Sequence, residues 1–124
     1  MAFELFKKSE YQGCRNFSKP AVFISVHYHQ LQFNKVSQYE CGFGKGKYVK
    51  LWYDRAERIV GIERTTKDDP DGMRINNTDN LSIGKFLQHH KLELKTITGK
   101  YLLQAHGALW VFDLKKRMEG RKHK

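Results

Sequence analysis

Alternating apolar and polar residues recur along the chain, a period of two that is typical of half-buried β-strands. The segment VFISVHY (22–28) predicts a strand because its β-branched and aromatic residues suit a pleated surface. The side chains on its apolar face are those of Val22, Ile24, Val26 and Tyr28. A polar turn near His29 and Gln30 then leads to a second strand, LQF at 31–33.

A short helix and another hairpin follow. Asn34 is a residue type that caps helix N-termini, so it predicts a helix that carries Val36 and Tyr39. The glycines of the next run, CGFGKGK, stop this helix because glycine adopts the left-handed conformation of a C-cap. The strands KYVKLWYD (47–54) and IVGIE (59–63) complete the first half of the chain.

The second half shows a similar order of patterns. A turn at 77–80 precedes a returning strand at 81–83, and KFLQHHKL (85–92) has the spacing of a helix with one buried face. The side chains on that face are Phe86, Leu87 and His90. TGKYLLQA (98–105) and ALWVFDL (108–114) then form a closing hairpin around a His-Gly turn.

This similarity predicts an internal repeat of residues 21–64 and 72–114, two ββαββ units joined by a surface linker at 65–71. The positions matched 50 residues apart are Leu31 and Leu81, Phe33 and Ile83, Lys35 and Lys85, Val60 and Trp110, and Ile62 and Phe112. The triplet Gly-Lys-Tyr at 46–48 recurs at 99–101, which is 53 residues later. We therefore expect two pseudo-symmetric units that share one core.

The length of 124 residues suits a single domain, here residues 21–114, with an N-terminal extension at 1–20 and a basic tail at 115–124. Its 40% hydrophobic and 13% aromatic residues are enough to form a core without disulfide or metal support. The side chains that we predict to be buried are Phe33, Val49, Leu51, Ile62, Phe86, Leu87, Leu102 and Phe112.

The composition excludes several classes of protein. A mean hydropathy of -0.69 and the lack of a long apolar run argue against a membrane-spanning helix. The N-terminal sequence has no apolar core of a secretory signal, and Cys14 and Cys41 do not form a disulfide framework, so we expect reduced thiols and a cytoplasmic protein.

The net charge is the first indication of function. The formal charge is +10, which favours an acidic partner such as nucleic acid. Residues 114–124 hold six cations and one carboxylate, so much of this excess lies in the tail. The tail is interpreted either as a nucleic-acid arm or as a solubilising terminus.

No residue pattern predicts catalysis, a cofactor or a bound metal. His27 and His29, together with His89 and His90, are interpreted as surface and packing residues rather than zinc ligands, and Cys41 as a small buried hydrophobe. The Gly-rich run at 41–47 lacks the order of a nucleotide-binding P-loop. We therefore expect a protein without enzymatic activity.

Each half resembles the swapped-hairpin module of the AbrB/SpoVT/MazE family, in the duplicated form found in MraZ proteins. The resemblance is carried by the hairpin, the short helix, the Gly-Lys opening of the third strand, the charged turn and the last apolar strand. It implies an α+β, β-dominated fold in which two units interleave their hairpins into one β-barrel, commonly on DNA. The residues on the implied contact face are His27, His29, Gln30, Lys35, Asn80 and Lys85.

We accordingly expect a nucleic-acid-binding or regulatory protein, with DNA favoured over RNA, acting as a monomer or homodimer. The alternative is an interaction module for an acidic protein, which the salt dependence and sequence tolerance of binding would distinguish. The candidate contact residues are Lys35, Lys45, Lys47, Lys50, Arg55, Arg58, Lys85, Lys115, Lys116, Arg117, Arg121 and Lys122.

Overall fold

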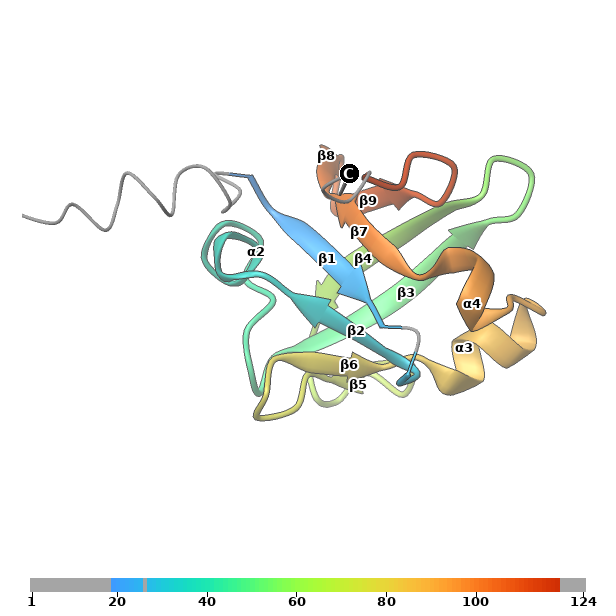
Figure 1. Ribbon diagram of the computed structural model, residues 1–124. Helices are drawn as coiled ribbons and strands as arrows, with labels where there is room; N and C mark the ends of the chain where they lie inside the picture. Colours follow the sequence, from blue (N-terminus) through green and yellow to red (C-terminus); the bar gives the residue numbers. More distant parts are fainter. Residues whose placement is uncertain (1–18, 26, 119–124) are drawn as a thin grey trace, which may run out of the picture.

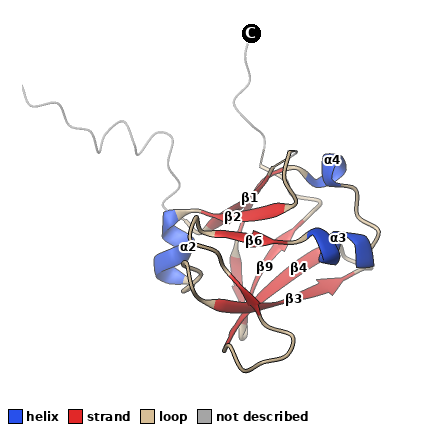
Figure 2. Ribbon diagram, turned by 90° about the horizontal axis from the view of Figure 1, so that it is seen from below, coloured by secondary structure: helices blue, strands red, loops and turns tan. Residues whose placement is uncertain are grey.

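The computed structural model describes residues 19–25 and 27–118. This part of the chain forms two antiparallel sheets with short helices at their ends (Figures 1 and 2), which confirms the prediction of a β-dominated fold. Sheet A has the order β6 (Asn80–Ser82), β2 (Gln30–Phe33), β1 (Ala21–Ile24), β7 (Gly99–Leu102). Sheet B has the order β5 (Met73–Arg74), β3 (Tyr48–Asp54), β4 (Ile59–Thr65), β9 (Leu109–Asp113), β8 (Gln104–His106). The helices are α2 (Lys35–Glu40), α3 (Gly84–His89) and α4 (Leu94–Ile97).

The apolar core lies between the two sheets. Of the side chains predicted to fill it, Phe33, Val49, Ile62, Leu87 and Phe112 are buried. Leu51 and Phe86 are half-buried and pack against this core. The prediction that Leu102 is buried is wrong. Side chains alternate along the chain here, so that Tyr101 and Leu103 point into the core and Leu102 is half-exposed.

Strand β1 is shorter than the sequence pattern predicts. It ends at Ile24, opposite Leu31 of β2 and Gly99 of β7. The chain then turns, and the side-chain oxygen of Ser25 accepts a hydrogen bond of 3.1 Å from the amide of His27. Tyr28 is 63% exposed, so its predicted place on an apolar strand face is wrong.

The local turn and cap signals are confirmed. The Asn34 side chain caps α2 by accepting a 2.8 Å hydrogen bond from the amide of Ser37. Gly42 follows this helix with a φ of 76°, in the left-handed region that favours glycine. The residue of α2 that is buried is Ser37. Tyr39, one of the two apolar residues that the predicted helix carries, is 82% exposed.

The predicted barrel is not closed, because the strands divide into two sheets. The chain passes between the sheets three times, between β2 and β3, between β5 and β6, and at Leu103 between β7 and β8. The duplicated swapped-hairpin arrangement is not confirmed, since β1 pairs with β2 while β5 and β6 lie in different sheets. The linker at 65–71 connects β4 to β5, with its first residue, Thr65, inside β4.

The registers nevertheless relate the two halves. Leu31 pairs with Leu81, and Gly61 pairs with Val111, so both pairs join residues 50 apart in the sequence. The strands that begin at the two Gly-Lys-Tyr triplets also pair across the halves. Tyr101 of β7 pairs with β1, and Tyr48 of β3 pairs with β5.

Candidate nucleic-acid interface

Five of the candidate cations come together from two chain segments, and we call them the basic end. They are Arg55, Arg58, Lys115, Lys116 and Arg117. The first two belong to the turn between β3 and β4, and the other three follow β9. The amide of Leu114 donates a 2.9 Å hydrogen bond to the carbonyl of Arg58, and the Lys115 ammonium contacts the carbonyl of Glu57. The two segments therefore form one continuous surface.

The described residues after β9, up to Met118, are hydrogen-bonded to the fold. The Arg117 guanidinium donates a 2.7 Å hydrogen bond to the carbonyl of Thr98. The amide of Met118 donates a 2.8 Å hydrogen bond to the carbonyl of Lys100, which continues the edge of β7. A Cβ atom on Gly99 would lie 2.3 Å from the Arg117 side chain, so only glycine leaves room for this arginine.

One of the five cations of the basic end forms an ion pair within the described chain, and the same two segments also carry Asp54 and Glu57. Lys115 forms an ion pair of 3.0 Å with Asp113. Burial opposes ionisation of Asp113, but the amide and ammonium of Lys115 outweigh this and lower the pKa of the carboxyl. Within the described chain the other four cations form no ion pair, and Arg55 contacts only the Nδ1 atom of His90, at 3.3 Å.

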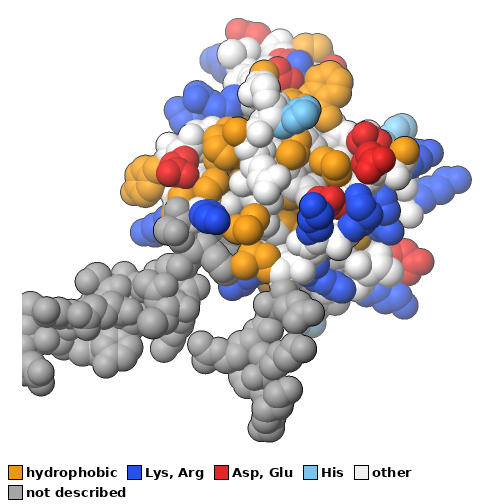
Figure 3. Space-filling model, turned by 90° about the horizontal axis from the view of Figure 1, so that it is seen from above, with side chains coloured by type: hydrophobic (Ala, Val, Ile, Leu, Met, Phe, Trp, Pro, Cys, Tyr) orange, Lys and Arg blue, Asp and Glu red, His pale blue; other side chains and the backbone are white. Residues whose placement is uncertain are grey.

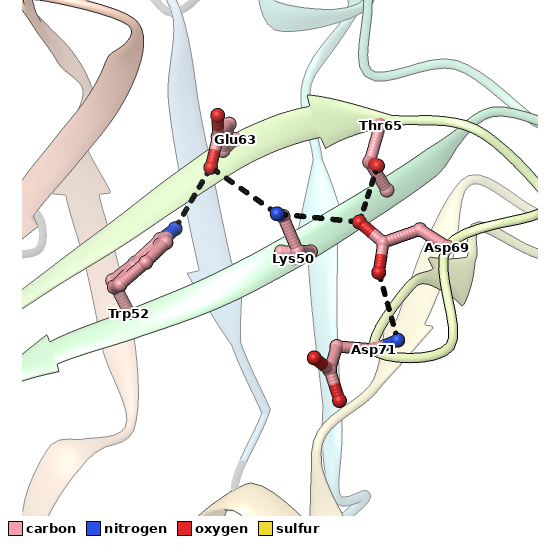
Figure 4. Close-up of polar contacts among 6 residues, drawn as sticks. All are labelled: Lys50, Trp52, Glu63, Thr65, Asp69 and Asp71. Carbon is pink, nitrogen blue, oxygen red and sulfur yellow. Dashed lines mark hydrogen bonds and ion pairs between the residues drawn. The ribbon is translucent and has the colours of Figure 1, made fainter.

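Lys50 lies in a different environment, on the outer face of sheet B (Figure 4). Its ammonium is 3.2 Å from Asp69 and 3.9 Å from Glu63, and the hydrogen bond and charge of Asp69 raise the pKa of Lys50. Asp69 is itself fixed by hydrogen bonds from the Thr65 hydroxyl (2.6 Å) and the Asp71 amide (2.9 Å). The ammonium of Lys50 is therefore already neutralised by carboxylates.

The remaining candidates do not join the basic end. Lys45 and Lys47 flank Gly46 at the start of β3, whereas Arg55 follows its last residue, so they lie at opposite ends of the strand. Lys35 and Lys85 are exposed near the starts of α2 and α3. The view from above shows Lys and Arg side chains on both sides of the surface with apolar side chains between them (Figure 3). Arg121 and Lys122 lie outside the described residues.

The loop from His27 to Gln30 forms part of the face implied by the family resemblance. His27 and His29 are exposed on this loop, and His27 therefore lies outside a strand although the segment at 22–28 predicts one. A Cβ atom on Gly84 would lie 3.6 Å from the Cβ of His29, which brings the loop against the start of α3 beside Lys85.

His90 is a packing residue, as predicted. Its ring lies 4.7 Å from Tyr53 and 4.9 Å from Phe86, measured between ring centroids. Burial, and then the charges of His89 and Arg55, lower the pKa of His90. Residues 19–25 and 27–118 contain no group of three His, Cys, Asp or Glu side chains placed to hold a metal ion.

Cys41 and the Gly-rich run at 41–47 have structural roles. Cys41 is buried, and this burial together with the charge of Glu40 raises the pKa of its thiol to about 12, so the thiol is protonated at neutral pH. Phe43, in the middle of the run, is fully buried, and Gly42 and Gly46 have φ values of 76° and 80°. The glycines thus serve the connection from α2 to β3.

Comparison of the chain with protein-family models, curated proteins and solved structures gave no match. None of the helices described between residues 19 and 118 has the length and apolar character needed to cross a membrane.

Proposed function

We propose that this protein binds nucleic acid at the basic end and does so without catalysing a reaction. The observation that carries the proposal is the junction of the β3–β4 turn with the segment after β9. It groups five cations, of which only Lys115 is paired with a carboxylate in the described chain. Uncompensated guanidinium and ammonium groups gain affinity for phosphates by releasing the counterions of the nucleic acid.

Contacts of this kind hold the backbone and carry little sequence information. The basic end therefore supports general affinity for DNA or RNA more directly than recognition of one operator. The preference for DNA rests on the resemblance to the AbrB/SpoVT/MazE family.

We also propose the family's duplicated arrangement for the fold. It is supported by the pairs Leu31 with Leu81 and Gly61 with Val111, because both join residues 50 apart and so are compatible with one two-fold axis. It is also supported by the exchange of partners, in which each Gly-Lys-Tyr strand pairs with the first strand of the other half. In this proposal the barrel is open at one place, between β5 and β6, which do not pair.

Charge reversal at two sites tests the proposed interface. The variant R58E/K116E removes two cations of the basic end, and K45E/K47E makes the same change of charge at the other end of β3. The seven residues of β3 span about 20 Å, more than two Debye lengths at physiological salt, so the two sites act separately.

Binding of a fluorescent 20-mer, single-stranded and duplex, is measured by anisotropy at 0.15 M salt, with thermal unfolding as the control for folding. We expect R58E/K116E to weaken binding at least about tenfold, and K45E/K47E less than about threefold. Equal effects of the two variants, or a larger effect of K45E/K47E, would contradict the proposed interface.

A further inference from the structure

The outer face of sheet A carries one row of side chains across all four strands. Strand register places Asn80 opposite Gln32, Gln32 opposite Phe23, and Phe23 opposite Lys100. Phe23 is 36% exposed although both neighbours, Val22 and Ile24, are buried in the core. The row thus consists of two amides, one aromatic ring and one cation.

The charge of this face distinguishes it from the other sheet. The strands of sheet A contain no Asp or Glu, and Lys100 is their one charged residue. Sheet B carries Asp54, Glu63 and Asp113 on its strands. A polyanion that approaches sheet A therefore meets no strand carboxylate.

No described helix covers the face, and its β7 edge adjoins the basic end. The described helices lie beside the ends of sheet A, with α2 at one end and α3 and α4 at the other (Figure 1). Met118 pairs with Lys100 at the β7 edge, and Arg117 is anchored on Thr98 beside it. The side chain of Gln32 is exposed and forms no hydrogen bond within the described chain, so its amide is available as donor and acceptor.

We infer that the outer face of sheet A binds single-stranded nucleic acid, an inference that rests on the proposed function and adds a base-contacting surface beside the basic end. In this arrangement an unpaired base stacks on Phe23, and the amides of Gln32 and Asn80 contact base edges. Arg117, beside the β7 edge, holds a flanking phosphate. Stacking of a base on an exposed ring requires an unpaired base, which a duplex does not present to a sheet.

The test compares two ligands of equal length and charge, a 12-mer of thymidylate and a 12-mer of abasic nucleotides, with the full chain at 0.15 M salt. Both ligands offer the same phosphates, but only the first offers bases. We expect the unmodified protein to bind the thymidylate oligomer roughly five- to 150-fold more tightly, the range measured for stacking of one base.

Two variants connect this difference to the sheet. F23L removes the ring but keeps an apolar side chain, and we expect it to weaken binding of the thymidylate oligomer to the level of the abasic one. Q32E adds a carboxylate to the centre of the face, and we expect it to weaken binding of both ligands. Because Gln32 is exposed and without hydrogen-bond partners, Q32E keeps the test valid if F23L does not fold.

The matched controls lie on sheet B. W52L removes a ring that is 52% exposed, and Q104E adds a carboxylate on the exposed strand β8. We expect neither control to alter binding more than about twofold.

Equal binding of the two ligands to the unmodified protein would overturn this inference while the proposed function stands. The absence of binding to both would overturn the inference and the proposed function together. Two other results would also overturn the inference. If W52L bound the thymidylate and abasic oligomers equally, the preference for bases would depend on sheet B. If the protein were a dimer that F23L dissociates, the Phe23 face would be a dimer interface.

Discussion

At the scale of single residues, the sequence predicts what depends on near neighbours. Asn34 and Gly42 were identifiable because a cap and a left-handed turn each require a particular residue type. The neutralisation of Lys50 was not predictable, because Asp69 lies 19 residues away and reaches it only after the β4–β5 turn folds back. Residue type therefore identifies a cation but not its partners.

Asn34 connects α2 to the start of β1, so its removal is expected to destabilise the protein. Its side-chain oxygen accepts hydrogen bonds from the amides of Ser37 and Ala21, and its NH₂ group donates to the carbonyl of Lys19. We expect N34A to lower the free energy of unfolding by about 2 kcal/mol, measured by urea denaturation. N34D, which retains the acceptor oxygen, is the control and should lose less. A loss below about 0.5 kcal/mol in N34A would contradict this role.

The buried thiol of Cys41 predicts a dependence of stability on alkaline pH. Its pKa is raised from 9.0 to about 12 in the folded protein. The unfolded chain therefore releases this proton first, so the contribution is complete below pH 9 and is lost as the pH rises toward 12.

We expect the free energy of unfolding to fall between pH 8 and pH 10, and to fall less in C41A, even though C41A is less stable at pH 8. Urea denaturation at the two pH values measures both slopes. The same slope in both proteins would show that Cys41 does not titrate differently in the folded and unfolded chains.

At the scale of elements, periodicity predicts that a strand exists better than where it ends. The alternation of VFISVHY continues to Tyr28, but β1 ends at Ile24, where its pairing with β2 and β7 ends. The run TGKYLLQA was predicted as one strand, whereas the chain changes sheets at Leu103 and forms β7 and β8. The ends of these strands are set by neighbours far away in the sequence.

The change of sheet at Leu103 gives a matched pair of substitutions. Leu103 is 4% exposed and belongs to the core, whereas Leu102 is half-exposed on the other side of the chain. We expect L103A to cost about 2 to 4 kcal/mol of unfolding free energy and L102A about 1 kcal/mol or less. Chemical denaturation of both variants checks the order. A larger loss in L102A would show that the register of β7 is wrong.

At the scale of the whole molecule, the charge could be counted from the sequence but its distribution could not. The net charge of +10 indicated an acidic partner. It did not indicate that Lys50 would be neutralised, or that Arg58 would lie beside the segment after β9. The repeat spacing of 50 residues was visible in the sequence and recurs in two strand registers, but the division into two sheets was not.

The six cations of residues 115–124 predict the result of a truncation. Residues 115–118 are held by hydrogen bonds to the fold, whereas residues 119–124 contribute Arg121, Lys122 and Lys124 by sequence alone. We expect deletion of 119–124 to weaken binding of all oligonucleotides alike, because cations that contact phosphates do not read bases. A selective loss for one sequence, seen in competition titrations, would show instead that the tail reads bases.

The central claim, binding of nucleic acid by uncompensated cations, is tested most directly by the affinity of the full chain for one single-stranded oligonucleotide across a series of salt concentrations. We predict that log K falls linearly with log salt, with a slope of about -0.7 for each phosphate contacted, so that four or five contacts give a slope near -3. An affinity too weak to measure at 50 mM salt, or one that does not change with salt, would contradict the claim.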